Sequence, residues 1–109
     1  METFKAGVVQ FDVVPGQVET NFEKVIDAVE KLASQGIRLV VLPEMFSSSF
    51  DNEHLKDHAA DSETVSHKLS HACKKFQIHA AGSMPVSKDG QIFNTFFYFD
   101  SSGGVTAVY

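Results

Sequence analysis

The chain has 109 residues, enough for one small domain or for part of a larger one. Hydrophobic residues make up 43% and charged residues 21%, a balance that excludes disorder along the whole length. The formal net charge is −5, and the nine scattered Lys and Arg residues do not form the concentrated basic surface that nucleic-acid binding requires. Ten phenylalanines are many for the interior of so short a chain, which favours a segment of something larger.

Membrane insertion and secretion are not expected. No apolar run approaches the ~20 residues that cross a bilayer. The amino terminus carries an acidic Glu2 and lacks the pattern of a signal peptide. The single cysteine, Cys73, excludes a disulfide within the chain. We therefore expect a cytoplasmic protein.

Periodicity predicts a strand and then a helix at the start of the chain. Lys5–Phe11 is short, rich in Val and Phe, and followed by a Pro15–Gly16 turn signal, which indicates a strand. Apolar residues recur every three or four positions over Val18–Ser34, which predicts an amphipathic helix. Gly36 stands where helices commonly end in left-handed backbone.

The middle of the chain predicts a buried strand, a loop and a second helix. Arg38–Leu42 ends in a continuous apolar run, typical of a strand covered on both faces. Met45–Ala60 has no clear period and is predicted to be a loop with at most a helical turn. A helix capped by Asp61 or Ser62 is expected to run to about Phe76.

The last third predicts three strands. Ile78–Met84 is the first, followed by a turn through Pro85 and Lys88–Gly90. Ile92–Asp100 and Val105–Tyr109 are predicted to form a hairpin around a Ser-Ser-Gly-Gly turn. Strands that alternate with helices predict an α/β architecture, and right-handed crossovers place both helices on the same side of the sheet.

Glu44 is the leading candidate for chemistry. It follows the most apolar strand, and Pro43 fixes its place beyond the strand's carboxyl end. Ligands of open α/β sheets bind at that edge. A carboxylate with the apolar neighbours Leu42, Met45, Phe46 and Phe50 is suited to act as a general base. The alternative is a solvated loop carboxylate with no chemical role.

The ordered set of these features resembles the opening of the nitrilase superfamily, the carbon–nitrogen hydrolases. The resemblance rests on LVVLPEMF (Leu39–Phe46) after a helix ending at Gly36, on Gly82–Ser83, on Phe93–Asn94 and on the closing Val105–Tyr109. It spans essentially the whole chain, and the order and spacing of the features carry it rather than any single tetrapeptide.

The resemblance implies a fold of class α/β, the first part of a four-layer αββα sandwich of the nitrilase type. Residues 1–109 would be the amino-terminal part of a single carbon–nitrogen hydrolase domain, truncated within a strand. It also implies hydrolysis of an amide to acid and ammonia by a Glu–Lys–Cys triad, with Glu44 as the general base. The family's Lys would come just after Tyr109 and its Cys far beyond, so the chain alone is expected to be inactive. No cofactor is implied.

The cysteine and the histidines are rival sources of chemistry. Cys73 falls on the apolar face of a predicted helix, where a free thiol is a small core residue. The pairs His54/His58 and His67/His71 have the i,i+4 spacing that lets two imidazoles share a metal ion. No further ligand completes a recognisable set, so no metal is expected.

Other polar residues are expected to have structural roles. Ser47–Ser49 lack the Gly-x-Ser-x-Gly pattern of a nucleophile and are predicted to form a flexible loop near the pocket. His79 is expected to be a hydrogen-bonded histidine of the core or edge. Asn94 would support the floor of the site, and the aromatic residues of Phe93–Phe99 would pack the sheet.

Two functions compete. The leading one is an amidase-like hydrolase acting on a small-molecule amide, and the Met45–Phe50 loop (MFSSSF) leans toward members of the ω-amidase kind. The alternative is a non-catalytic α/β module used in binding or assembly. An uncovered sheet face predicts association, as a homo-oligomer or with the family's carboxyl-terminal segment. A Lys and a Cys encoded downstream of Tyr109 at family spacing would favour the enzyme.

Overall fold

The computed structural model describes residues 3–109. Its elements are, in chain order, β1 (Lys5–Val8), α1 (Val18–Ser34), β2 (Ile37–Val41), α2 (Leu55–Phe76), β3 (His79–Lys88), β4 (Gln91–Phe99) and β5 (Val105–Val108). The five strands form one sheet in the order β1-β2-β3-β4-β5. β1, β2 and β3 are parallel, and β4 and β5 continue the sheet antiparallel.

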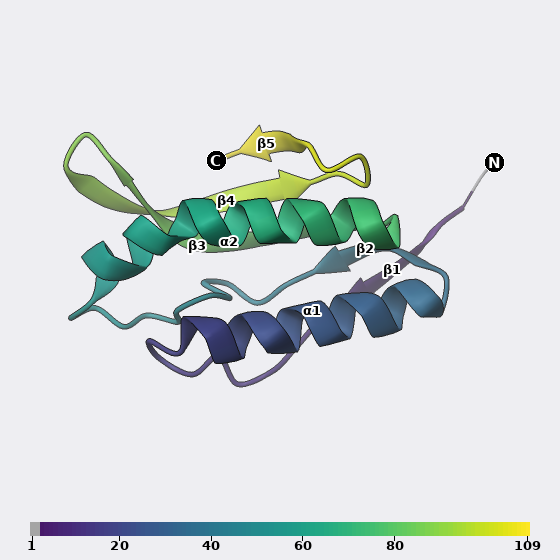
Figure 1. Ribbon diagram of the computed structural model, residues 1–109, viewed down its shortest axis with the longest axis horizontal. Coiled ribbons are helices and arrows are strands. Elements are labelled where there is room, and N and C mark those ends of the chain that lie inside the picture. Colours follow the sequence, from purple (N-terminus) through teal and green to yellow (C-terminus); the bar gives the residue numbers. More distant parts are fainter. Residues whose placement is uncertain (1–2) are drawn as a thin grey trace.

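Both helices lie on one face of this sheet (Figure 1), as the right-handed crossovers predict. α1 buries Val25 and Val29, and α2 buries Val65 and Leu69, against a sheet surface that includes Phe99. Gly36 has φ +84°, so the chain leaves α1 through the left-handed backbone expected there. The helix layer and the sheet layer thus enclose one hydrophobic core.

The opposite face of the sheet carries apolar side chains that nothing within residues 3–109 covers. Val8 pairs with Val41 in neighbouring strands, and both are exposed. Phe96 and Tyr109 are exposed on the same face, toward the edge of the sheet formed by β4 and β5. Large apolar groups gathered on one face mark a surface that associates with other protein.

α2 begins seven or eight residues earlier than the sequence predicts. It starts at Leu55, after an N-cap residue His54 that makes no side-chain cap, so neither Asp61 nor Ser62 caps it. The expected loop Met45–Ala60 therefore ends at residue 54. The inner face of the extra turns includes the buried polar residue His58, and Ser62 continues it four positions later. A helix is recognised in a sequence by apolar residues that recur every three or four positions. That pattern could not reveal these turns, because a His and a Ser occupy their inward positions.

β3 is longer than expected because it continues through Pro85 to Lys88. β2 pairs with β3 only as far as Ala81, and the carbonyl of Ser83 on that side accepts from the Phe46 N–H. The Pro85 nitrogen points toward the β2 side of β3, like the Ser83 carbonyl. Because β2 has already ended there, the proline removes no hydrogen bond between strands. At the other end of the sheet β1 stops at Val8, short of the expected Phe11.

Turns close the remaining strands as predicted. Asp89 and Gly90 have φ of +52° and +77°, the backbone of a tight hairpin between β3 and β4. β4 and β5 form the predicted hairpin around residues 101–104. Among residues 3–109 no helix has the length and apolar character needed to span a bilayer.

Candidate functional site

Glu44 lies just beyond the carboxyl end of β2, the second of the five strands in the sheet. After β2 ends, the Leu42 N–H donates to the Ala81 carbonyl at 2.8 Å, which keeps the chain beside β3. The following residues fold into a turn in which Met45 and Phe46 are buried and the Glu44 side chain remains exposed. Of the apolar neighbours expected around Glu44, Leu42, Met45 and Phe46 are buried and anchor its backbone, whereas Phe50 is exposed. The carboxylate of Glu44 is left free to meet a ligand.

Ser83 of β3 holds this turn by two hydrogen bonds. Its Oγ accepts from the Met45 N–H at 2.9 Å, and its carbonyl accepts from the Phe46 N–H at 3.1 Å. Met45 has φ +53°, a backbone region that non-glycine residues rarely adopt. Ser83 therefore stabilises a turn whose left-handed backbone is unfavourable for the methionine that occupies it.

Gly82 allows Phe46 to reach the sheet. A Cβ built on Gly82 would lie 2.9 Å from Phe46 Cδ1 and 3.1 Å from the Leu42 Cβ, closer than side chains pack. Phe46 is fully buried in that space. The Gly82–Ser83 pair thus has two separate tasks, which are to admit the phenylalanine and to bind the turn that carries Glu44.

A hollow of about 290 Å³ opens at this edge of the sheet. It is bordered by Glu44, Ser83 and Asn94, residues that lie far apart in the sequence. Asn94, expected to support the floor of the site, thus borders the same hollow as Glu44. The full lining comprises Val41, Leu42, Glu44, Ala81, Gly82, Ser83, Asn94, Phe96 and Tyr109.

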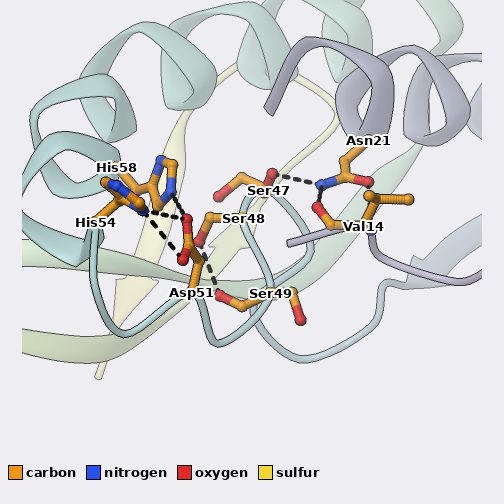
Figure 2. Close-up of polar contacts among 8 residues, drawn as sticks. All are labelled: Val14, Asn21, Ser47, Ser48, Ser49, Asp51, His54 and His58. Atoms are coloured by element: carbon orange, nitrogen blue, oxygen red, sulfur yellow. Dashed lines mark hydrogen bonds and ion pairs between the residues drawn. The ribbon is translucent and has the colours of Figure 1, made fainter. Parts of the chain in front are cut away.

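Asn21 is a residue of this region that the sequence analysis missed. It is fully buried in α1; its Oδ1 accepts from the Val14 N–H, and its Nδ2 donates to the carbonyls of Val14 and Ser47, all at 2.9 Å (Figure 2). It lies four positions before Val25, so it belongs to the inner face of the helix. A polar residue inside an apolar stripe is the signal that could have revealed it.

The serines after Glu44 form a packed turn rather than the flexible loop expected. Ser47 and Ser48 are buried. The Ser47 carbonyl accepts from Asn21, and the Ser48 carbonyl accepts from the Gly16 N–H at 3.0 Å. Among the residues described, Ser47–Ser49 do not line the hollow beside Glu44. The Ser47 carbonyl thus joins this turn to α1, and the Ser48 carbonyl joins it to the loop before α1.

Asp51, which follows the Ser47–Ser49 turn, is joined by hydrogen bonds to two histidines at the start of α2. Its Oδ2 lies 2.9 Å from His58 Nε2 and 3.1 Å from His54 Nδ1 (Figure 2). These hydrogen bonds, first that of His58 and then that of His54, hold the pKa of Asp51 below its usual value, and Asp51 raises the pKa of His54. A Cβ on Gly16, which has φ +75°, would lie 2.9 Å from Asp51 Oδ2, so a larger residue there would strain the backbone and displace the Asp51 carboxylate.

Replacing Asp51 by asparagine is expected to destabilise the protein in a pH-dependent way. The stability linked to the raised pKa of His54 is complete below 6.5 and is lost as the pH rises through the folded-state pKa. The stability linked to the lowered pKa of Asp51 is complete above 3.8 and is lost as the pH falls through the folded-state pKa. Urea unfolding should therefore show the largest difference between wild type and Asp51→Asn from pH 3.8 to 6.5.

Asp27→Asn is the matched control, because Asp27 is an exposed aspartate on α1 with no part in the cluster. Its effect on the free energy of unfolding should show no maximum in that pH range. A difference between wild type and Asp51→Asn that is independent of pH would contradict the ionic contribution assigned to Asp51.

Cys73 and the outer histidines take the structural places expected of them. Cys73 is fully buried in α2, and burial, followed by the charge of Asp100, raises its thiol pKa to about 12. Such a thiol is not a nucleophile at neutral pH. His67 and His71 are exposed. Within residues 3–109 no group of three His, Cys, Asp or Glu side chains is placed to hold a metal ion.

His79 differs from expectation. It begins β3, but its Nδ1 is buried and has no hydrogen-bond partner within the described chain. Its ring packs against Tyr98, with the ring centroids 5.8 Å apart. Aromatic packing therefore holds the His79 ring. The prediction of a hydrogen-bonded histidine is wrong for Nδ1.

Comparisons with known proteins agree on one family. A family model described as "Carbon-nitrogen hydrolase" matches residues 5–109. The hydrolase in the agr operon of Staphylococcus aureus is 32% identical over 101 residues, which cover 91% of this chain and 39% of that protein. The 2-oxoglutaramate amidase of Bacillus subtilis (strain 168) is 30% identical over 102 residues, covering 92% and 39% respectively.

A solved structure has the same arrangement of elements. The NitN amidase from Neterenkonia sp. AN1 superposes with a TM-score of 0.89 at 21% identity, over 98% of this chain and 43% of that one. The chain thus spans about two fifths of the length of these relatives.

Proposed function

Because the chain belongs to the carbon–nitrogen hydrolase family, we propose that it contributes Glu44 as the general base for the hydrolysis of a small amide. The observation that carries the proposal is the position of Glu44 beside a hollow at the carboxyl ends of the central strands. Ligands of α/β sheets bind at this edge. The α/β fold predicted from the sequence is confirmed, with one helix layer and one sheet layer of the nitrilase-type sandwich.

The proposed chemistry is acyl transfer through a thioester. Glu44 takes the proton from a cysteine thiol, the thiolate attacks the amide carbonyl, and ammonia leaves with a proton returned by the acid form of Glu44. Water then adds to the thioester and releases the carboxylic acid. A lysine stabilises the oxyanion formed in each addition. Cys73 cannot be the nucleophile because it is buried away from the hollow, and none of the described residues that line the hollow is a lysine. The cysteine and the lysine of this mechanism would therefore come from chain outside residues 1–109.

Residues 1–109 would accordingly be the amino-terminal part of one hydrolase domain. The uncovered sheet face that carries Val8, Val41 and Phe96 supports this proposal, because such a face needs a partner layer. The length of the relatives leaves room for one. In the absence of that layer, we expect the same face to bind a second copy of the chain.

The proposed substrate is an ω-amide. Support comes from the relatives, since one is named for activity on 2-oxoglutaramate and others carry the name omega-amidase. The hollow beside Glu44 is open to solvent, so a small ligand can reach it, and Asn94 lies at its border.

Ammonia release from a panel of amides tests the proposed function. The complete protein should hydrolyse ω-amides such as 2-oxoglutaramate, and a Cys73→Ala variant should retain that activity, because Cys73 is a core residue of α2. The 109-residue chain alone should release no ammonia, since a base without its nucleophile cannot carry out acyl transfer. Ammonia release by the short chain, or its loss in Cys73→Ala with the fold intact, would contradict the proposed roles.

A further inference from the structure

We propose that Ser83 is a positioning residue that sets the direction of the Glu44 side chain. This proposal rests on the general-base role of Glu44 proposed above. Ser83 borders the same hollow as Glu44. It accepts hydrogen bonds from the backbone N–H groups of Met45 and Phe46, the two residues that follow Glu44. The serine acts through the backbone of the turn rather than by contact with a reacting atom.

The carboxylate of Glu44 depends on its backbone for its position. Glu44 is exposed, and the ion pairs within residues 3–109 are those of three histidines with Asp51 and Glu63. The backbone just after Glu44 is, in contrast, tightly held. The Met45 N–H reaches the Ser83 Oγ at 2.9 Å in a buried contact, and the Met45 carbonyl accepts from the Ser49 N–H at 2.9 Å.

The Met45 conformation explains why the hydroxyl matters. A φ of +53° is unfavourable for methionine, so the turn persists only while other contacts hold it. Removing the Ser83 hydroxyl leaves the buried Met45 N–H without its acceptor, which adds a desolvation cost to the strain. The turn then relaxes toward negative φ and rotates the peptide that joins Glu44 to Met45. A displacement of about 1 Å at a catalytic group is enough to lower a rate by roughly 100-fold.

The variants Ser83→Ala, Ser83→Thr and Ser87→Ala in the complete protein separate a positioning role from a structural one. Alanine removes the acceptor, whereas threonine restores a hydroxyl and favours strands. Ser87 lies four residues later in β3 and is exposed, so it controls for the loss of a serine hydroxyl from the same strand. The readouts are kcat and KM for ammonia release from a small ω-amide, and hydrogen–deuterium exchange of the segment 44–48 by mass spectrometry.

For Ser83→Ala we expect kcat to fall about 10- to 100-fold with KM unchanged. Amide exchange in 44–48 should be about tenfold faster because the Met45 N–H has lost its acceptor. Ser83→Thr should restore both properties, and Ser87→Ala should alter neither. This pattern would support the proposal, because a general loss of structure would not be reversed by threonine and would not spare KM.

Three results would overturn the proposal: unchanged exchange in Ser83→Ala, faster exchange with unchanged kcat, or a loss of kcat that threonine does not restore. Glu44→Gln measured in the same series keeps the two proposals apart. An inactive Glu44→Gln beside a fully active Ser83→Ala would remove only the role of Ser83. A fully active Glu44→Gln would remove the general-base role itself.

Discussion

Replacing Glu44 by glutamine in the complete protein should lower kcat for amide hydrolysis by roughly two to four orders of magnitude, the usual contribution of a positioned general base. Glutamine keeps the size and shape of the side chain but cannot accept the thiol proton. Because Glu44 is exposed and the turn is held by backbone contacts to Ser83, the fold should not change. Ammonia release measures the first effect, and urea unfolding measures the second.

Glu53→Gln is the matched control. Glu53 is an exposed glutamate in the segment before α2 and does not border the hollow. Its substitution removes the same charge from the same region of the chain, so it should leave kcat unchanged. If Glu44→Gln and Glu53→Gln were equally active, Glu44 would be a surface carboxylate, and the family's base would have to lie elsewhere.

Replacing Phe46 by alanine should lower the free energy of unfolding by about 3–5 kcal/mol, as expected for a large aromatic side chain removed from a core. Phe46 is fully buried, and it fills the space above Gly82, where even a Cβ would be 2.9 Å from its ring. The cavity would open beneath the turn that carries Glu44. Urea unfolding of the wild type and the variant gives the difference.

Phe50→Ala provides a control of the same chemical change four residues later, where the phenylalanine is 55% exposed. Its cost should stay within about 0.5 kcal/mol, as for surface substitutions. Equal destabilisation by the two variants would show that Phe46 does not anchor the turn. Loss of activity in Phe46→Ala below its unfolding transition would show that the anchor also serves the site.

The sequence predicted most closely the bounds of those elements whose inward residues are mainly apolar. α1 has the predicted bounds because its stripe of Val and Ile residues repeats with the helical period. The first turns of α2 were missed because His58 and Ser62 occupy inward positions there. The length of β3 was missed because Pro85 is a reliable break only where its nitrogen faces a partner strand, and here β2 has already ended.

For the site, the sequence could indicate Glu44, Gly82, Ser83 and Asn94 as separate features, but not the bonds that join them. The contact of Met45 with Ser83 depends on a left-handed φ at a methionine, which no propensity predicts. The buried bonds of Asn21 depend on which loop carbonyls reach it after folding. Both are tertiary effects that override local preference.

The order of the sheet has a consequence for how the protein is made. Each strand after β1 pairs with the strand synthesised just before it. At a translation rate of roughly 5–20 residues per second, a strand that leaves the ribosome therefore finds its partner already present. The turn that carries Glu44 is the exception, because its hydrogen bond joins residues 38 positions apart and must wait for Ser83. During synthesis the strand before Glu44 can pair with β1 several seconds before Glu44 itself acquires its final direction.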